Sequence, residues 1–539
     1  MLLGEEDSDL LVRSEEQDTA DVSFFSGKKS PKLKRSFGIS SSYFHISSRG
    51  LADLSGYLID TLDASLDWVD SHVTGIGNLP ARLFFWLTGA YVYEAYNISF
   101  HEFGHGLSYR ANGGTFDTRV GTKTDDGDND TKKRENFFAY FFRSIFKGGP
   151  FRGGNTHYRG DSEIDETYKK RQKAHGKTWF EFAKSLEGQS EQAQKDLFAK
   201  FIKDHKLEKA LELLGQDKFS KIFGSETVVA NEAVIAEAVD EAFEDLTSIP
   251  GGKSAVLKAL DYTDKEISLV KSFDIIHAAA GMNNETYAAE RIADRIFENK
   301  KGSAFEWWAY LAGKLSPLCY CSMKDYKKGP TSDDPVSLWQ DYKNWGIIDD
   351  VSKSDFVLAY TLSLLCSGTT YAPMFAARRK GFSVFGGKQG FSPLEFHGFR
   401  IPETFVYMTS KGIAYRVKSG YRFNDSTTIT FGTEFVAKGE SKMEAVLGGH
   451  KTFGSLKDLG ISATFTFGKE FNVDFSCNVP LSHQFFFDIG YSTYSADSLY
   501  GERLTSVNKF NERRGHEVWV SLSRRFNTFS RGGAVLGKI

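Results

Sequence analysis

Apolar and polar side chains alternate with a period of two through the last quarter of the chain, from about residue 400 to residue 526. In NVDFSCNV, residues 472–479, valine, phenylalanine and cysteine alternate with asparagine, aspartate and serine. About eight such segments of roughly ten residues, separated by turn signals, follow one another. Because successive side chains of a strand point to opposite faces, each segment has one apolar and one polar face. We therefore expect residues 400–530 to form an antiparallel β domain.

Two architectures are compatible with this alternation. In a soluble β-sandwich the apolar face is the core, whereas in a transmembrane β-barrel it meets lipid and the polar face lines the lumen. The length of the segments, their aromatic residues and their even number favour a barrel. The last segment ends at Phe526 and resembles the aromatic-terminated last strand of bacterial outer-membrane barrels, although thirteen residues follow it here. The β domain is thus an outer-membrane barrel candidate, with a sandwich as the alternative.

Helical periodicity dominates the chain before residue 380. Residues 51–73 place leucine and valine at steps of three and four, and residues 81–110 are expected to form a second, strongly apolar helix. Residues 356–377 carry no charged side chain and precede a basic run. Segments 83–100 and 356–377 are long enough for membrane spans, with buried core helices as the alternative. A mean hydropathy of −0.36 excludes a chain embedded in a membrane throughout.

These patterns divide the chain into five regions and give an α+β fold class. Residues 1–35 carry clustered charges and no secretory signal, so we expect a disordered arm there. Residues 36–114 are helical, residues 115–275 form a polar helical insertion, and residues 276–380 hold further helices. We therefore expect a helical core with a helical insertion, followed by the C-terminal β domain at 400–530.

The segment His101-Glu102-Phe103-Gly104-His105 is an HExxH motif on the predicted helix 81–110. Histidines four residues apart lie on one helix face, so both imidazoles can bind a single Zn²⁺. Glu102 lies beside them, where it can accept a proton from the attacking water and pass it to the leaving amine. The motif therefore predicts a zinc-dependent peptidase with Glu102 as the general base.

The stretch FHEFGHGLSYRANGG, residues 100–114, resembles the zinc helix of site-2-protease-like intramembrane metallopeptidases, which carry HExGH on an apolar helix. The resemblance covers about thirty of the 539 residues. It implies a third ligand from a later membrane helix that bears an Asp-Gly motif. The one Asp-Gly pair of this sequence, Asp126-Gly127, lies in a charged loop, so the chain departs from the family at this ligand.

A second resemblance concerns Glu290 and Asp294, which have the ExxxD form of the gluzincins. In that group the glutamate is the third zinc ligand, and the aspartate one turn later hydrogen-bonds a ligand histidine. The pair lies on an alanine-rich predicted helix, residues 283–297. The resemblance implies Glu290 as the third ligand, with Asp294 behind it. His277 and Tyr287 are the nearest candidates for donors to the oxyanion.

The sequence thus predicts a zinc metalloendopeptidase with a zincin-like helical core. Its expected partners are Zn²⁺, a protein or peptide substrate and a membrane, whereas a net charge of −3 gives no support for nucleic-acid binding. Four cysteines in 539 residues do not form a disulfide framework. The alternative function is an outer-membrane barrel or interaction protein with a structural or degenerate zinc site. The alternative to membrane attachment is a secreted effector.

Overall fold

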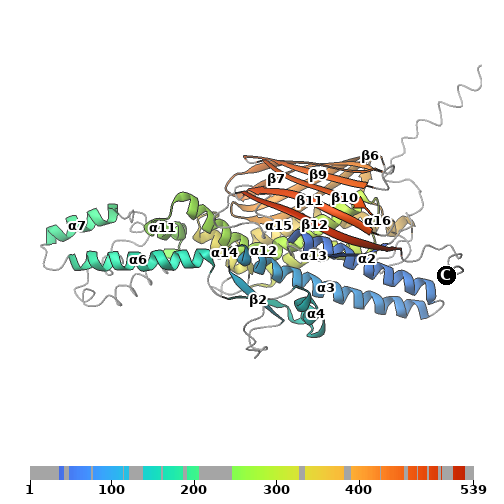
Figure 1. Cartoon of the computed structure of the whole chain (residues 1–539), viewed down its shortest axis with the longest axis horizontal. Coiled ribbons are helices and arrows are strands. Elements are labelled where there is room, and N and C mark those ends of the chain that lie inside the picture. Colours follow the sequence, from blue (N-terminus) through green and yellow to red (C-terminus); the bar gives the residue numbers. More distant parts are fainter. Residues whose placement is uncertain are drawn as a thin grey trace, which may run out of the picture.

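A long helix, α12 (Asp264–Glu298), packs against helices on several sides and against the C-terminal sheet in the computed structural model (Figure 1). Its first turn is fixed by a capping box, in which Thr263 and Glu266 satisfy each other's backbone N–H groups. The structure describes residues 36–41, 48–73, 77–112, 114–120, 137–159, 162–185, 191–204, 246–326, 334–380, 390–424, 426–453, 459–469, 471–481, 485–495, 499 and 514–527.

The helices that pack against α12 come from both sides of it in the sequence. They are α2 (Ser48–His72), α3 (Asn78–Ala111), α13 (Ala304–Met323) and α14 (Asp334–Asn344). Two further helices, α15 (Lys353–Leu365) and α16 (Gly368–Lys380), connect this bundle to the sheet. The helical regions expected at 51–73 and 81–110 correspond to α2 and α3.

The chain between α3 and α12 contributes strands as well as helices. Strands β2 (Thr115–Val120) and β3 (Gly154–Arg159) form an antiparallel pair beside α3, and α4 (Phe137–Phe146) and α5 (Gly149–Arg152) lie between them in the chain. Further helices among the described residues of this stretch are α6 (Glu163–Ser185), α7 (Glu191–Asp204) and α11 (Gly252–Ala259). In Figure 1, α6 and α7 project away from the body. The boundary expected at residue 275 falls inside α12.

The C-terminal region forms one antiparallel sheet with the order β1-β12-β11-β10-β9-β8-β7-β6-β5-β4. In the described part of the chain, eight long strands follow residue 398, and β1 and β4 form the two edges. The strands are β1 (Ser36–Ser41), β4 (Glu395–Phe396), β5 (Phe399–Thr409), β6 (Gly412–Asn424), β7 (Thr427–Gly439), β8 (Met443–Phe453), β9 (Leu459–Phe467), β10 (Phe471–Pro480), β11 (Phe485–Ser495) and β12 (Arg514–Asn527). The expected fold class, a helical core followed by an antiparallel β domain, is confirmed.

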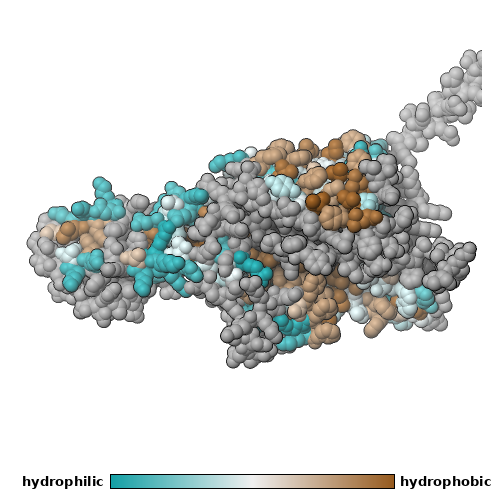
Figure 2. Space-filling view, viewed as in Figure 1, coloured by the Kyte–Doolittle hydropathy of each residue, from teal (hydrophilic) through white to brown (hydrophobic). Residues whose placement is uncertain are grey.

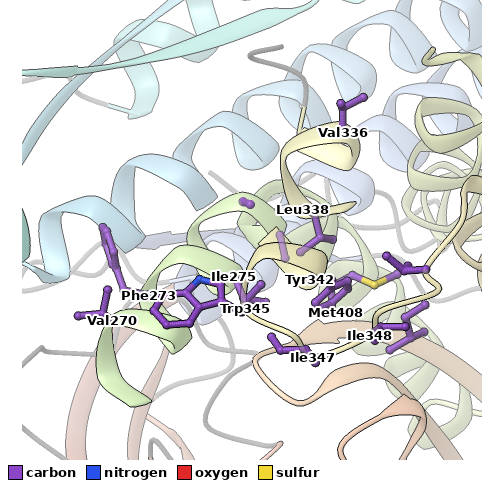
Figure 3. Close-up of a cluster of buried hydrophobic side chains, with 14 of the residues drawn as sticks. Val270, Phe273, Ile275, Val336, Leu338, Tyr342, Trp345, Ile347, Ile348 and Met408 are labelled. Atoms are coloured by element: carbon purple, nitrogen blue, oxygen red, sulfur yellow. The ribbon is translucent and has the colours of Figure 1, made fainter. Parts of the chain in front are cut away.

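Two hydrophobic clusters hold the helices together. In the first, side chains from α12, α14 and β5 meet, among them Phe273, Tyr342 and Met408 (Figure 3). The second cluster contains Phe100 and Phe103 of α3 together with residues of α2, α4 and α13. Both clusters reach α12, so burial fixes α3 and α14 on this helix.

The apolar segment 356–377 forms two helices rather than one. Helix α15 ends at Leu365, and α16 begins at Gly368. At the break, the Ser367 hydroxyl donates to the Ser363 carbonyl and accepts from the Thr404 backbone N–H of β5. Within the described residues, no helix has both the length and the apolar character to cross a membrane. The charged arm expected at 1–35 lies outside the described residues.

Candidate metal centre

Helix α3 brings the two histidines of the HExxH motif together, as their spacing predicts. His101 and His105 are both buried, and their Nε2 atoms lie 3.4 Å apart. Four residues make slightly more than one turn, so the two rings extend from the same face of α3. The pair forms two ligand positions of a candidate metal centre.

The third member of the group is Asp334, the first residue of α14. Its Oδ2 lies 2.8 Å from His101 Nε2 and 3.0 Å from His105 Nε2. A tetrahedral zinc site with bonds of about 2.0–2.1 Å has ligand–ligand edges of about 3.3–3.4 Å. The two Nε2 atoms already have this separation, and Asp334 needs to move by about 0.5 Å. After this shift, the three atoms would have the spacing of three ligands of a zinc ion.

Helix α12 provides an acceptor for the other nitrogen of each histidine. His105 Nδ1 donates to the backbone carbonyl of His277 over 2.7 Å. His101 Nδ1 lies 3.3 Å from Oε1 of Glu285, a buried carboxylate that also accepts from Ser316 over 2.9 Å. A proton held on Nδ1 leaves the lone pair of Nε2 facing the metal position. These contacts favour a proton on Nδ1 of each ring, which is the tautomer that would leave Nε2 free for a metal ion.

The helices α3 and α12 approach closely at this point because small residues line their contact. A Cβ atom added to Gly281 of α12 would lie 2.3 Å from His101 Nε2. Asn284, one turn later, donates to the Phe100 carbonyl over 3.1 Å. The absence of a side chain at Gly281 thus makes room for the His101 ring, and Asn284 adds a hydrogen bond between the two helices.

Glu102 is held from the other side by β3. The Thr156 hydroxyl lies 2.7 Å from Glu102 Oε2, and Gly154 lets the strand approach the same side chain. Burial raises the pKa of Glu102 above its ordinary value, although the two histidines oppose the shift. A raised pKa brings this carboxylate closer to the range in which a general base both accepts and returns a proton near neutral pH.

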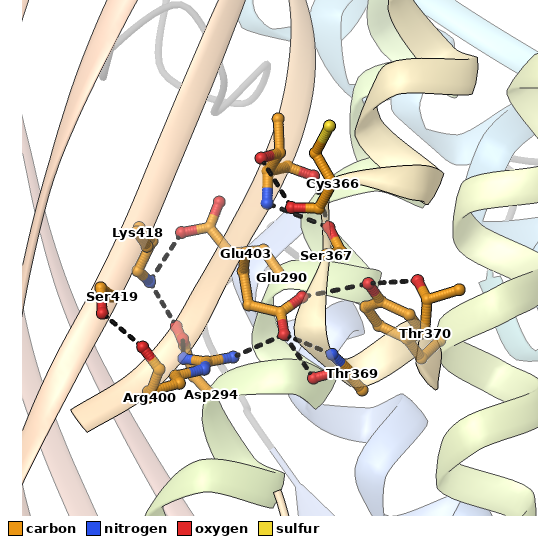
Figure 4. A network of polar contacts seen from close by, with 12 residues as sticks. Glu290, Asp294, Cys366, Ser367, Thr369, Thr370, Arg400, Glu403, Lys418 and Ser419 are labelled. Atoms are coloured by element: carbon orange, nitrogen blue, oxygen red, sulfur yellow. Dashed lines mark hydrogen bonds and ion pairs between the residues drawn. The ribbon is translucent and has the colours of Figure 1, made fainter. Parts of the chain in front are cut away.

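The assignment of Glu290 as third ligand, and of Asp294 as its helper, is replaced by a different arrangement. Glu290 accepts from the Tyr407 hydroxyl over 2.6 Å and pairs with Lys418 over 3.0 Å. Asp294 pairs with Lys418 over 2.5 Å and with Arg400 over 3.0 Å (Figure 4). Both carboxylates therefore face the positive side chains of β5 and β6, and the candidate ligand group contains Asp334 instead.

The candidate oxyanion donors have different surroundings. Burial lowers the pKa of His277 to about 3, so its ring is neutral near pH 7. Its Nδ1 is buried and has no hydrogen-bond partner among the described residues, and its ring contacts Tyr158 at 4.5 Å between centroids. Tyr287 belongs to the hydrophobic cluster that contains Phe100 and Phe103. The roles of His277 and Tyr287 as donors stay predictions, and Tyr158 is a further candidate.

Asp334, Glu285 and Thr156 are the residues that the sequence did not identify. Asp334 stands before Pro335, a pattern typical of a helix start, but 229 residues separate it from His105. Glu285 lies five residues before Glu290 on the same predicted helix, and its sequence surroundings give no sign that it faces His101. Thr156 lies in a glycine-rich stretch that was expected to belong to a helical insertion.

Comparisons with known proteins add nothing to this description. No family model matches the chain, and no match was found among curated proteins or solved structures. The candidate metal centre therefore rests on the geometry of His101, His105 and Asp334 and on the chemistry of the HExxH motif.

Proposed function

We propose that the chain is a zinc-dependent peptidase in which His101, His105 and Asp334 hold Zn²⁺ and Glu102 is the general base. One observation carries the proposal: two histidine Nε2 atoms and one carboxylate oxygen lie within 3.4 Å of one another. The glutamate between the histidines in the sequence is itself buried and held in place. Such a group of three ligands with a fixed glutamate is typical of hydrolytic zinc sites.

The number of ligands favours catalysis over a structural role. Structural zinc sites are closed by four protein ligands, whereas catalytic sites use three and leave one position for water or substrate. Among the described residues, the group consists of two histidines and one aspartate. A structural site also has no use for Glu102.

Each residue of the candidate site has a distinct role in the proposed reaction. A bound Zn²⁺ would polarise the scissile carbonyl and increase the acidity of water. Glu102 accepts the proton that the water loses as its oxygen bonds to the carbonyl carbon. The C–N bond then breaks, and the amine leaves with the proton that Glu102 returns. Thr156 keeps the Glu102 carboxylate in place during both transfers, because its hydroxyl contacts Oε2.

The donor set is closer to one of the two resembled families than to the other. Two histidines and an aspartate from a later helix are what the likeness to site-2-protease-like peptidases implies. The chain departs from that family in that Asp334 is followed by proline, whereas the family has an Asp-Gly motif on a membrane helix. The gluzincin set would need Glu290, whose oxygens contact Tyr407, Arg416 and Lys418. The first likeness therefore supports the proposal better.

Replacing Glu102 by glutamine tests the proposal. We expect Glu102→Gln to bind about one zinc per chain, as the wild type does, and to cleave a mixture of random-sequence peptides at least about 100-fold more slowly. Zinc content by elemental analysis and new amino termini by mass spectrometry are the two readouts. Equal cleavage by the variant and the wild type would contradict the assignment of Glu102.

The alternative function, an interaction protein with a structural or degenerate zinc site, makes a different prediction. There, zinc removal by a chelator lowers the melting temperature, while neither wild type nor variant releases new amino termini. Asp334→Asn complements Glu102→Gln, because it changes a proposed ligand. If the chain is a zinc peptidase, this variant should lose both bound zinc and peptide cleavage. Cleavage that persists in zinc-free wild type would exclude the zinc mechanism.

A further inference from the structure

The C-terminal sheet has an inner face, which points toward α12, and an outer face, which points away from it. The outer face is apolar, and the inner face is polar. Phe467 is 46% exposed, whereas the neighbouring Thr466 is 1% exposed. The same holds at Phe471 with 44% and Asn472 with 1%. On β8, Met443 is 67% exposed, and the adjacent Glu444 is 1% exposed. The alternation is therefore reversed relative to a sheet whose outer face meets water.

Ion pairs occupy the inner face. Arg416 of β6 pairs with Glu434 of β7 over 3.2 Å, and both side chains are at most 2% exposed. Figure 4 shows Lys418, also on β6, turned toward Glu290 and Asp294 of α12. Charges are buried and paired on the inner face, whereas the exposed outer face carries phenylalanine, leucine and methionine. Folding alone gives no reason for this distribution in water.

A second exposed apolar surface lies on α3, α4 and α5. Phe138, Phe142 and Phe146 are spaced four residues apart, so they share one face of α4, and all three side chains are exposed. Phe146 is 85% exposed, and Phe151 of α5 is 87% exposed. The opposite face of α4 is buried through Phe137 and Tyr140. Helix α4 is thus apolar on both its buried and its exposed faces, which is typical of helices surrounded by apolar material.

The two surfaces lie on opposite sides of the same part of the molecule. In Figure 1 the sheet lies above the helices, and α4 lies below them. Figure 2 shows hydrophobic residues over the sheet and again at the lower edge, while the α6–α7 arm carries several groups of hydrophilic residues beside a smaller hydrophobic patch. A single protein partner docks on one side and would cover one of these surfaces. A surrounding apolar medium covers both.

We infer that these two surfaces form one belt that contacts the hydrocarbon of a lipid bilayer, while the α6–α7 arm stays in water. The belt consists of the outer face of β7–β11 and the exposed residues of α3, α4 and α5. The inference does not depend on the peptidase activity, because it rests on the exposure of apolar side chains alone. It places the candidate metal centre, which lies between α3, α12 and α14, in a body that touches lipid.

Bromine-labelled lipids test the inference directly. Single cysteines at Leu447 on the sheet, at Phe142 on α4 and at Lys200 on α7 are introduced into a variant of the full chain whose four native cysteines are serine. Each carries an environment-sensitive dye, and the protein is reconstituted into phosphatidylcholine vesicles. We expect brominated acyl chains to quench the dyes at positions 447 and 142 and to leave the dye at position 200 unquenched. Quenching at neither 447 nor 142, or equally at all three positions, would overturn the belt.

A second measurement keeps the four native cysteines, so its result does not depend on whether the cysteine-free variant folds. Leu447→Lys and Phe142→Lys each place a charge in the proposed belt, whereas Lys200→Glu changes a charge on the arm. We expect each lysine variant to partition into vesicles about 30-fold or more weakly than wild type, with Lys200→Glu unchanged. Equal partitioning of all three variants contradicts the inference. Loss for Leu447→Lys alone, together with a dimer in detergent that this substitution dissociates, would identify a second copy as the partner and contradict it too.

Discussion

Replacing Glu285 by glutamine should weaken zinc binding without removing a ligand. Glu285 Oε1 lies 3.3 Å from His101 Nδ1 and accepts from Ser316 over 2.9 Å. A glutamine of nearly the same shape still offers an oxygen, but it carries no negative charge to stabilise a proton on Nδ1. Changes to a group behind a ligand histidine typically cost 10–100-fold in metal affinity. We therefore expect a zinc dissociation constant about 10–100-fold higher, or about 1.4–2.7 kcal/mol.

Competition with a fluorescent zinc chelator at fixed pH measures this change. The matched control is Glu290→Gln, which removes the same charge from the same helix five residues later. Glu290 contacts Tyr407 and Lys418 rather than a histidine, so its substitution should leave the zinc dissociation constant unchanged. If Glu290→Gln weakened zinc binding as much as Glu285→Gln, the assignment of Glu285 would be refuted.

Three further predictions concern residues of α12 and β3. Glu290→Gln should lower the free energy of unfolding by about 3 kcal/mol, because it leaves buried Lys418 short of one partner; urea unfolding measures this. Asp294→Asn should make the free energy of unfolding less dependent on pH in the acid range. Burial alone would raise the pKa of Asp294, but Lys418 and Arg400 outweigh burial and lower it. The stability it contributes is present above about pH 4 and is lost as the pH falls through its folded pKa, so wild type and variant should converge in urea unfolding below about pH 4. Gly154→Ala should slow peptide cleavage and leave zinc content unchanged, because a Cβ there would lie 2.6 Å from Glu102 Cγ.

Periodicity was enough to predict the main elements. The steps of three and four between residues 51 and 73 correspond to α2, and the period of two after residue 400 corresponds to the eight long strands. The break in the apolar run at 356–377 was harder to predict, because it is accompanied by a hydrogen bond between Ser367 and Thr404 of β5. Such a contact joins segments that are distant in sequence and leaves no local pattern.

The candidate site was predictable only where its residues share a helix. His101, Glu102 and His105 are linked by spacing, whereas Asp334 reaches them through the packing of α14 on α12. The ExxxD pattern of Glu290 was misleading for a physical reason. Two acidic residues four apart on a helix can bind a metal ion, but they can equally well pair with basic side chains of a neighbouring strand. In this chain Lys418 and Arg400 take that role. A single sequence does not distinguish the two uses of the same pattern.

The identity of the zinc ligands is the central claim, and a crystal structure of the zinc-loaded protein tests it most directly. Anomalous difference maps at the zinc edge locate the ion without assumptions about its neighbours. We predict one peak, with His101 Nε2, His105 Nε2 and an oxygen of Asp334 each about 2.0–2.2 Å away. A peak bound by Glu290 in place of Asp334, or a peak distant from His101 and His105, would contradict the account.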